Sequence, residues 1–560
     1  MHTAFNRLVV ESNQKVFCFF KSKFDALRSE YFKTVFIFIF CLSTSVLLPS
    51  IFFPDLAAAK DPAPLSIAIS SEPASLNPHK KRVVSDQMLA TQMFDELITS
   101  DNNWKIIPSL VEGWSNPDEL TWIFKLRRNV RFHNGDLLTS RDVIFSIDRI
   151  RSKYKEYAGS FTTVDSYEII DDYTFKIKTI KPDGLLLTKL TWIFIVPEKY
   201  IKTAGETEFE KNPIGSGPYK FVSGNTKKLQ LKLNDNYWKT PAGIKDVIIQ
   251  YVPQADQYQA LLNGSVDIVS GISSDEFEKL KSNPEFHAVY VESSMFYYLG
   301  MDVKREKTPK VELDQNPFCN QKVRLAVAKA IDLDEINKAV FNSLAVPASQ
   351  IANNLVFGFN PEIKIEERNI EKAKSLMKEA GYESGFKVVL NTPLGSREKI
   401  AHMLARQLSN INIQVQVQPV ETKLFWNSIF KEDHEFSFFL AGWGVDRSMD
   451  RTLGQLFASR TGETQGKINF TMYSNPRVDE LINLANGEKN EDKQQKYFQE
   501  AVAVIMSDKP VIPLFSIPAF YGLSKRVEWN PPIDPVIQIK YIKFMENKNS
   551  LLDSLKGIFK

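Results

Sequence analysis

The chain has 560 residues, of which 43% are hydrophobic and 24% are charged, as in ordinary globular proteins. Its length suggests about three to four domain-sized units with ample core to bury. The formal net charge is only +3, so bulk electrostatics imply neither a nucleic acid nor an acidic lipid surface as partner.

The first 59 residues have the pattern of an export signal. Lys33 precedes an uncharged apolar run, residues 34–53, and the small-residue site at residues 57–59 follows it. A run of about 20 apolar residues is also long enough to span a membrane as a retained anchor. Pro49, Pro54 and the small-residue site favour cleavage over retention, and we expect the leader to be removed.

Removal of this leader would leave a nearly neutral chain with one cysteine. Six Lys or Arg and four Asp or Glu lie in residues 1–59, so 64 cations and 63 anions remain. Cys319 is then the only cysteine, and no internal disulfide can form. Cys41 follows Phe40 rather than the small residue that a lipoprotein site requires. We therefore expect an exported product without a lipid anchor.

An α+β region is predicted over about residues 106–205. Its patterns are, in order, a strand, a helix and a second strand, at residues 121–136, 138–150 and 171–182. Thr139 and Asp142 stand at the spacing of a capping box at the start of the helix. This pattern of strands and a helix differs from the α/β pattern that follows it.

A strand–helix–strand pattern occurs twice farther along the chain. The first copy covers residues 245–252, 254–264 and 265–272, and the second covers residues 386–393, 397–408 and 411–420. Strands joined in this way need a crossover within one sheet. The copies lie more than 100 residues apart. We therefore predict two α/β lobes, each with its own sheet.

The sequence contains no recognisable catalytic or metal-binding pattern. The five histidines after residue 59 have no His, Cys or acidic partner at metal-ligand spacing: His79, His133, His287, His402 and His434. Residues 462–467 are one residue short of a phosphate loop. Residues 442–447 follow a strand like a dinucleotide fingerprint, but Arg447 replaces the third glycine. We predict a non-enzyme without metal or cofactor that captures a ligand between hinged lobes.

Four segments then match a known family in its order: Pro108–Ile150, Asn212–Val222, Asn320–Ile336 and Lys509–Ser516. Through them the sequence resembles the extracellular solute-binding proteins of family 5, the peptide receptors of ABC importers. The resemblance implies an α/β, two-lobed periplasmic-binding-protein fold of class II, hinged by two crossing segments. It implies an inserted α+β domain at 106–205, lobe I at 60–105, 206–310 and 516–560, and lobe II at 311–515.

The resemblance also implies an ammonium site. In peptide-binding members, the acid three residues beyond a Gly-Trp pair receives the α-ammonium of the ligand, and here that acid is Asp446. A buried carboxylate and ammonium would form charge-assisted hydrogen bonds. From the residues alone, Asp446 could equally be a turn or cap acid. Trp443 is either a wall of the pocket or a plain core residue.

Five further positions depart from or extend the family pattern. Arg397 is the candidate for the C-terminal carboxylate of the ligand, against a solvated residue at a helix start. Val84 lies in the segment expected to pair with peptide backbone, and Arg82 stands where the oligopeptide pattern has an acid near the site. Arg447 would neutralise the neighbouring aspartate or meet an acidic ligand. Leu440 replaces an arginine that helps some oligopeptide receptors hold a carboxylate.

The resemblance therefore implies a monomeric periplasmic receptor, cleaved after Ala59, that delivers short peptides to the inner-membrane permease of an ABC importer. An alternative is the same fold with a non-peptide solute, such as a nickel chelate, haem, glutathione or an opine-like compound. A third hypothesis, an exported hydrolase, lacks support because nucleophile–base and metal patterns are missing.

Overall fold

The computed structural model describes residues 63–80, 84–154, 161–240, 243–431, 433–461, 465–533 and 536–545. The predicted leader, its cleavage site and the alternative of a retained anchor fall outside these ranges. None of the helices in the described ranges is both long and apolar enough to cross a membrane. Residues 64–560 belong to one compact unit.

One mixed sheet of 11 strands runs through this unit, in the order β15-β14-β16-β12-β17-β11-β1-β10-β9-β8, with β13 paired to β17. The strands are β1 (Leu65–Ile69), β8 (Tyr219–Gly224), β9 (Lys228–Leu233), β10 (Asp246–Tyr251), β11 (Ile268–Ser270), β12 (Phe286–Met301), β13 (Val346–Pro347), β14 (Phe386–Pro393), β15 (Ile413–Val420), β16 (Phe438–Gly444) and β17 (Val511–Ser524). The prediction of two separate sheets was wrong, because β12 and β17 are long enough to serve both lobes.

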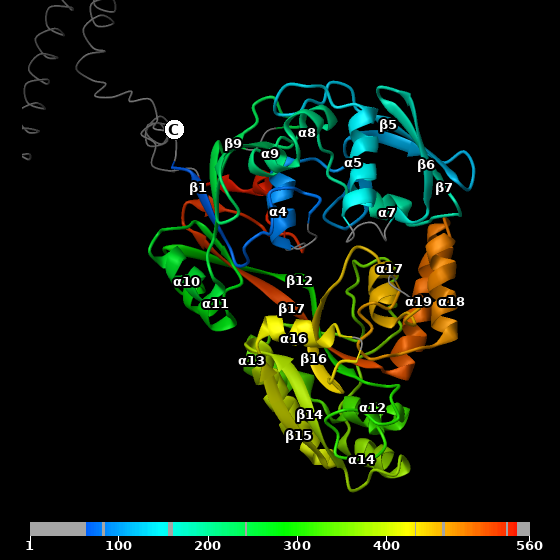
Figure 1. Cartoon of the computed structure of the whole chain (residues 1–560). Helices are drawn as coiled ribbons and strands as arrows, with labels where there is room; N and C mark the ends of the chain where they lie inside the picture. Colours follow the sequence, from blue (N-terminus) through cyan, green and yellow to red (C-terminus); the bar gives the residue numbers. More distant parts are fainter. Residues whose placement is uncertain are drawn as a thin grey trace, which may run out of the picture. The chain divides into compact units, whose positions relative to one another are not determined.

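The antiparallel pair β12 and β17 joins the lobes (Figure 1). In one half, β17 also pairs with β11, and in the other half β12 also pairs with β16. Between the halves the register shifts from Glu292 to Phe296, which is an irregularity of the kind that bends a strand. Two serines bond to backbone there: Ser293 Oγ donates to the Ile517 carbonyl (2.5 Å), and Ser516 Oγ donates to the Ser293 carbonyl (3.0 Å).

We call Ser293–Met295 together with Ile517 the crossing. By strand pairing we propose that the chain changes lobe there, where the resemblance placed the boundaries after residues 310 and 515. The crossing is the place where backbone pairing is weakest between the two halves of the sheet. It therefore has the properties of a hinge.

Lobe I contains the first predicted strand–helix–strand unit, formed by β10, α10 (Gln254–Leu262) and β11. β1 lies between the two strands and pairs in parallel with both. Leu65, Ile67 and Ala68 of β1 are fully buried, as expected for a strand inside a sheet that is covered on both faces. The other helices of this lobe are α4 (Val84–Met93), α8 (Glu198–Ala204), α9 (Glu206–Lys211) and α11 (Ser274–Lys281).

Lobe II contains the second predicted unit, β14, α15 (Ser396–Leu408) and β15, with the two strands parallel. Ile400, Leu404 and Leu408 of α15 are buried, as their spacing predicts. The remaining helices are α12 (Gln321–Ala330), α13 (Leu333–Phe341), α14 (Ile370–Glu379), α16 (Thr422–Ile429), α17 (Met449–Thr452), α18 (Pro476–Gly487) and α19 (Glu491–Asp508), with a π-turn at Leu453–Phe457 after α17.

The inserted α+β domain is built on a four-stranded antiparallel sheet, in the order β4-β5-β7-β6. Its elements are β4 (Val111–Ser115), β5 (Thr121–Leu126), α5 (Ser140–Lys153), β6 (Val164–Asp171), β7 (Thr174–Thr179) and α7 (Leu186–Leu190). The predicted capping box is confirmed, since Thr139 and Asp142 bond reciprocally. The predicted first strand was too long, because β5 ends at Leu126 and the chain turns at Asn129, whose φ is 66°.

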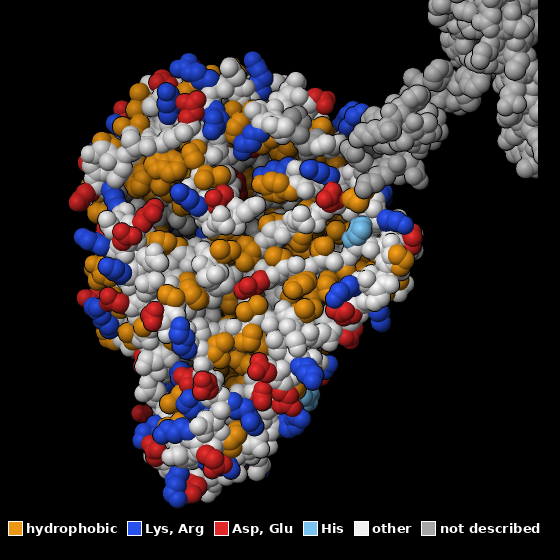
Figure 2. All heavy atoms as spheres, turned by 180° about the vertical axis from the view of Figure 1, so that it is seen from behind, with side chains coloured by type: hydrophobic (Ala, Val, Ile, Leu, Met, Phe, Trp, Pro, Cys, Tyr) orange, Lys and Arg blue, Asp and Glu red, His pale blue; other side chains and the backbone are white. Residues whose placement is uncertain are grey.

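Short elements complete the described chain: β2 (Ile98–Ser100), β3 (Ile106–Pro108), β18 (Val527–Glu528) and β19 (Lys543–Phe544), and 3₁₀ turns at Pro317–Cys319, Ser409–Ile411 and Ile539–Tyr541. Figure 2 shows hydrophobic side chains gathered across the middle of the back face. On that face, among the described residues, Lys and Arg side chains are interspersed with Asp and Glu.

Candidate ligand-binding cleft

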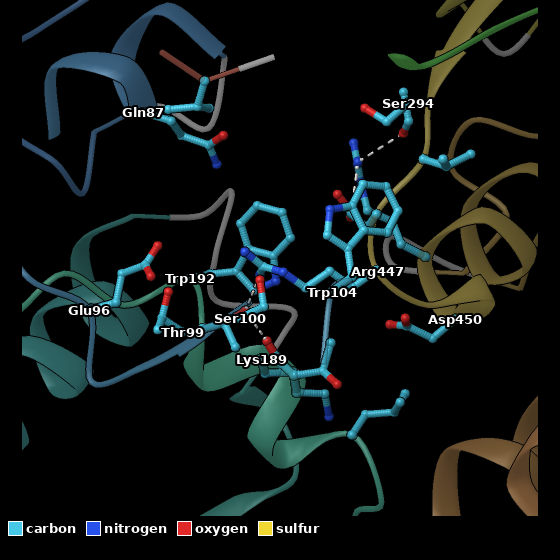
Figure 3. Close-up of a pocket in the computed structure, with 18 of the residues that line it drawn as sticks. Gln87, Glu96, Thr99, Ser100, Trp104, Lys189, Trp192, Ser294, Arg447 and Asp450 are labelled. Carbon is cyan, nitrogen blue, oxygen red and sulfur yellow. Dashed lines mark hydrogen bonds and ion pairs between the residues drawn. The ribbon is translucent and has the colours of Figure 1, made fainter. Parts of the chain in front are cut away.

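A cleft of about 3180 Å³ lies between lobe II on one side and lobe I with the inserted domain on the other. Ligand pockets for small molecules commonly measure about 300–1,000 Å³, so this cleft has room for a larger solute or for a solute with water. Val84 of α4, Ser294 of the crossing, Trp192 after α7, and Asp446 of lobe II are among its lining residues. Figure 3 shows side chains from these parts facing one another.

β16 leads the chain from the core of lobe II to this cleft. Its first four residues are fully buried, and its last residue, Gly444, lines the cleft. Beyond it, the Val445 amide donates to the Ser294 carbonyl (2.8 Å), so the loop stays attached to the crossing. Ser448 then pairs with Phe357 and caps α17. An acid follows a buried strand here because the strand ends at the cleft wall.

Asp446 lies on that wall and is held by an arginine that the sequence analysis did not identify. Arg451 Nη1 donates to Asp446 Oδ2 at 3.1 Å and lies 3.5 Å from the Gly444 carbonyl. The Asp446 side chain is only 14% exposed, so the carboxylate is largely withdrawn from bulk water yet faces the cleft. This position fits both predicted roles of Asp446, as a ligand-binding carboxylate and as an acid in a turn.

A second carboxylate, Asp450, lines the cleft four residues later. Burial, and then the nearby charge of Asp446, raise the pKa of the Asp450 carboxyl to about 6. Like charges that are both withdrawn from water oppose each other's ionisation. The two acids therefore make this wall attractive to a cation. The sequence contained a signal for Asp450, because it lies four residues after Asp446 and two acids at that spacing can point to the same side. Only the fold shows that this side is the cleft.

Trp443 has the position of a core residue. It is 7% exposed, its indole Nε1 donates to Thr452 Oγ1 (3.0 Å), and it belongs to the main core of lobe II. The Arg451 guanidinium lies 4.7 Å from the centroid of its ring. Such a cation–π contact positions the arginine that in turn holds Asp446. Trp443 thus supports the wall from behind, and it is not among the described residues that line the cleft.

Arg447 extends from lobe II to the inserted domain. Its Nη1 donates to Thr191 Oγ1 at 2.8 Å, and its guanidinium carbon lies 5.8 Å from the centroid of the Trp192 ring. Its backbone is fixed by Phe357, whose amide donates to the Arg447 carbonyl (2.8 Å). Among the described residues no carboxylate lies within ion-pair distance of Arg447, so it does not neutralise its neighbour Asp446.

The other predicted site residues are dispersed. Val84 lines the cleft and is 47% exposed, but it begins helix α4 and is not part of an extended segment. Arg397 lies 5.1 Å over the Tyr297 ring and beside Gly442, on the face of the sheet opposite Trp443. It is not among the described residues that line the cleft. Leu440 is fully buried. Arg82 lies outside the described residues.

Two other polar clusters border the cleft. Asp95 accepts hydrogen bonds from Ser216, Tyr237 and Trp238 at 2.8–2.9 Å, and its burial raises the pKa of its carboxyl. Lys189 pairs with Asp183 at 2.6 Å. Both acids are thus occupied within the protein. They give the side of the cleft formed by lobe I and the inserted domain a fixed polar lining.

The histidines of the described chain do not form a metal site. No group of three His, Cys, Asp or Glu side chains that could hold an ion occurs among the described residues. His79 is buried against Arg149 Nη1 (2.6 Å) and the Phe194 carbonyl (2.8 Å). Burial and the arginine charge lower the His79 pKa to about 3, so the ring is a neutral structural acceptor.

Lobe II also touches the inserted domain away from the crossing, and we call this the outer contact. The turn between α18 and α19 supplies Asn486 and Lys489, and the inserted domain supplies Gly184 and residues 116–119. The Gly184 amide donates to the Asn486 carbonyl (3.0 Å). Lys489 Nζ donates to Asn116 Oδ1 (2.8 Å) and to the carbonyls of residues 118 and 119. Figure 1 shows α18 and α19 beside β6 and β7.

Comparison with known proteins places these features in context. Residues 105–465 match the family model described as bacterial extracellular solute-binding proteins, family 5 Middle. The chain is 26% identical over 475 residues to heme-binding protein A of Haemophilus influenzae, covering 78% of this chain and 84% of that protein. It is 28% identical over 475 residues to the glutathione-binding protein GsiB of Pectobacterium atrosepticum, covering 81% and 88%.

Solved structures share the same fold. The ABC transporter-associated periplasmic binding protein DppA of Helicobacter pylori, in complex with peptide STSA, superposes with a TM-score of 0.72 at 23% identity. The match covers 86% of this chain and 98% of that one. The predicted fold class, two α/β lobes with an inserted α+β domain, is therefore confirmed.

Proposed function

The chain belongs to the bacterial extracellular solute-binding proteins of family 5, and from that premise we propose that it captures short peptides in the cleft for an ABC importer. The family is a class of binding proteins rather than enzymes, which confirms the prediction of a non-enzyme and removes the hydrolase hypothesis. The proposal adds the class of ligand, the residues that hold it, and the partner, which is an inner-membrane permease.

The observation that carries the proposal is the pair of acids on the lobe II wall. Asp446 faces the cleft at 14% exposure, and Asp450 lies beside it with its pKa raised to about 6. An α-ammonium between them would form charge-assisted hydrogen bonds, roughly twice as strong as neutral ones. It would also return the Asp450 pKa toward its ordinary value. A peptide ammonium is thus complementary to this wall in charge and in hydrogen bonding.

Lobe closure then depends on the ligand. Without a cation, bringing the inserted domain over this wall costs free energy, because it withdraws the Asp450 carboxylate from water with no ion-pair partner among the described residues, while Asp446 keeps Arg451. An ammonium offsets that cost only when the lobes are together. A ligand shifts a conformational equilibrium by its differential affinity for the two states. The acids therefore make closure conditional on an amine-bearing solute.

The alternative is a non-peptide solute in the same cleft, such as a nickel chelate, haem, glutathione or an opine-like compound. Relatives named for heme and glutathione give this alternative its weight. Glutathione carries an ammonium and would use the same two acids, whereas haem carries none. Removal of Asp446 therefore separates amine-bearing solutes from the rest.

We propose native mass spectrometry of the protein purified from its own periplasm, followed by calorimetry with the ligand that co-purifies. An amine-bearing peptide is expected, and Asp446→Asn should weaken its binding by at least about thirtyfold. Asp314→Asn is the matched control, because the Asp314 side chain is 99% exposed. A ligand without an amino group, or an unchanged affinity in Asp446→Asn, would refute the peptide assignment.

Location and oligomeric state are part of the same proposal. We propose a monomer in the periplasm, released from its leader by cleavage after Ala59. N-terminal sequencing and light scattering of the purified protein test both points. A mature chain that starts well before residue 60, or a stable dimer, would contradict them.

A further inference from the structure

We infer that Arg447 receives a carboxylate, so that the solute is a compact zwitterion whose negative group lies close to its ammonium. This inference rests on the proposed function and names the charge pattern of the ligand. It assigns a role to a site residue for which the sequence left two roles open. It also replaces Arg397, which the fold places away from the cleft.

The guanidinium of Arg447 has more N–H donors than its hydrogen bond to Thr191 uses. A guanidinium carries five N–H groups and keeps its charge in proteins. In the described chain, the side chain of Arg447 has one hydrogen-bond acceptor, the Thr191 hydroxyl, and its Nε is buried without an acceptor. A buried donor without a partner is unfavourable, because it has lost its hydrogen bond to water. An incoming carboxylate would accept from the Nη donors that the Thr191 bond does not use, and it would balance the charge.

The neighbouring arginine of the same loop provides an internal comparison. Arg451 lies on an aromatic face, 4.7 Å from the Trp443 centroid, and is paired with Asp446. Arg447 also lies over an aromatic ring, Trp192, but no described carboxylate pairs with it. One arginine is therefore neutralised within the protein, and the other presents its charge to the cleft. Figure 3 shows Arg447 in the middle of the cleft beside Trp192.

The inserted domain positions this charge without neutralising it. The Thr191 hydroxyl that accepts from Arg447 in turn donates to the Thr188 carbonyl (2.7 Å), so its lone pair is directed by the end of α7. The Trp192 ring supports the flat guanidinium. These contacts hold the plane of the group in place. A planar, supported guanidinium is suited to a two-point contact with a carboxylate.

The chain positions of the two charges limit the size of the ligand. Asp446 and Arg447 are adjacent residues, so the ammonium and carboxylate they receive cannot be far apart. An extended peptide spans about 3.3–3.6 Å per residue. The carboxylate is therefore either the C-terminus of a short peptide, or an acidic side chain next to the amino terminus. Both sources present the same group to Arg447.

The competing explanation is that Arg447 is only a strut between lobe II and the inserted domain, since its hydrogen bond to Thr191 joins the two. A strut would contribute to closure around any ligand, charged or neutral. A carboxylate receptor would affect only ligands that carry the carboxylate. The two roles therefore differ in their dependence on ligand charge.

Calorimetry with the full chain and four tripeptides separates these roles: Ala-Ala-Ala, its C-terminal amide, Asp-Ala-Ala and the amide of Asp-Ala-Ala. We expect the wild type to bind a carboxylate-bearing peptide about tenfold more tightly than Ala-Ala-Ala-amide. If Asp-Ala-Ala-amide recovers that affinity, the acidic side chain is the source. If only the peptides with a free C-terminus bind with that affinity, the terminal carboxylate is the group that Arg447 receives.

The variants give the decisive comparison. Arg447→Gln should reduce the preference for a carboxylate to less than about twofold and leave Ala-Ala-Ala-amide binding nearly unchanged, while Arg447→Lys should keep part of the preference. Arg477→Gln removes a surface charge paired with Glu480 and serves as the control. Equal weakening of all four peptides by Arg447→Gln, or no preference in the wild type, would overturn the inference alone. Failure of the wild type to bind any of them would overturn the proposed function with it.

Discussion

Gly184 of the inserted domain and Glu488 of lobe II are in backbone contact across the cleft. The Glu488 carbonyl oxygen occupies the space that a Cβ at position 184 would need, and Gln494 Nε2 lies 2.8 Å from that space. The Gln494 side chain can move aside, but the Glu488 backbone cannot do so without shifting the chain. The outer contact therefore requires glycine at position 184, because a side chain there would clash with the backbone of lobe II.

Gly184→Ala should hold the lobes apart at the outer contact. We expect about a tenfold loss of affinity for any ligand that needs closure, with little change in the melting temperature, because the clash arises only between lobes. Small-angle scattering of the ligand-bound protein should show a larger radius of gyration. Gly113→Ala is the control, since a Cβ there meets no atom within 4 Å. An unchanged affinity would show that closure does not use this contact.

Lys489→Met should weaken the same contact by a different route. It removes the ammonium that donates to Asn116 and the two following carbonyls but keeps the stem that packs toward the Trp122 ring, 5.6 Å from the charge. We expect a several-fold loss of affinity, on the order of 1 kcal/mol. Lys493→Met, on the exposed face of α19, is the control. In the double variant with Gly184→Ala the two losses should not add, because both act on one interface.

Ligand affinity should depend on pH through Asp450. Its pKa of about 6 means that the carboxyl is ionised at pH 7.5 and largely protonated at pH 5. Protonation removes a negative charge beside the ammonium site, so affinity for an amine-bearing peptide should fall by up to about tenfold between these pH values. Calorimetry at both values measures the change. Asp450→Asn should bind weakly at both, and a wild type without pH dependence would contradict the role of Asp450.

The same raised pKa has the opposite consequence for the stability of the ligand-free protein. A carboxyl whose folded pKa is above its ordinary value of 3.8 favours folding at low pH, and this contribution is lost as pH rises through about 6. At pH 8, Asp450→Asn should therefore raise the free energy of unfolding by about 1–3 kcal/mol, because it removes a charge that burial disfavours. Urea unfolding measures this, and Asp314→Asn should leave it unchanged.

The sequence predicted the second strand–helix–strand unit almost to the residue. β14, α15 and β15 have clear periods of two and 3.6, and Gly395 marks the helix start with φ of 105°. The single sheet could not be predicted in the same way. The polar residues Glu292–Ser294 interrupt the alternation of β12, so one strand of 16 residues has the pattern of two short ones.

The site was predicted in part. Asp446 and Arg447 share the cleft because they follow a strand that ends there, which the sequence indicated. Asp450 and Arg451 were not assigned roles, because their directions depend on α17 and its cap at Ser448. Arg397 was expected near the ligand because relatives place a carboxylate-binding residue close to that position. In the fold it lies at the start of α15, over Tyr297 and beside Gly442, on the face of the sheet opposite Trp443.

The long strands β12 and β17 also constrain how this protein can be divided. Neither lobe can be excised as an independent fragment, because each would keep half of both strands and expose the rest as unpaired edge. Long bare edges are templates for aggregation. Duplication, fusion or grafting in this fold is therefore expected to succeed at its exposed loops or its inserted domain, and to fail when a cut falls between the lobes.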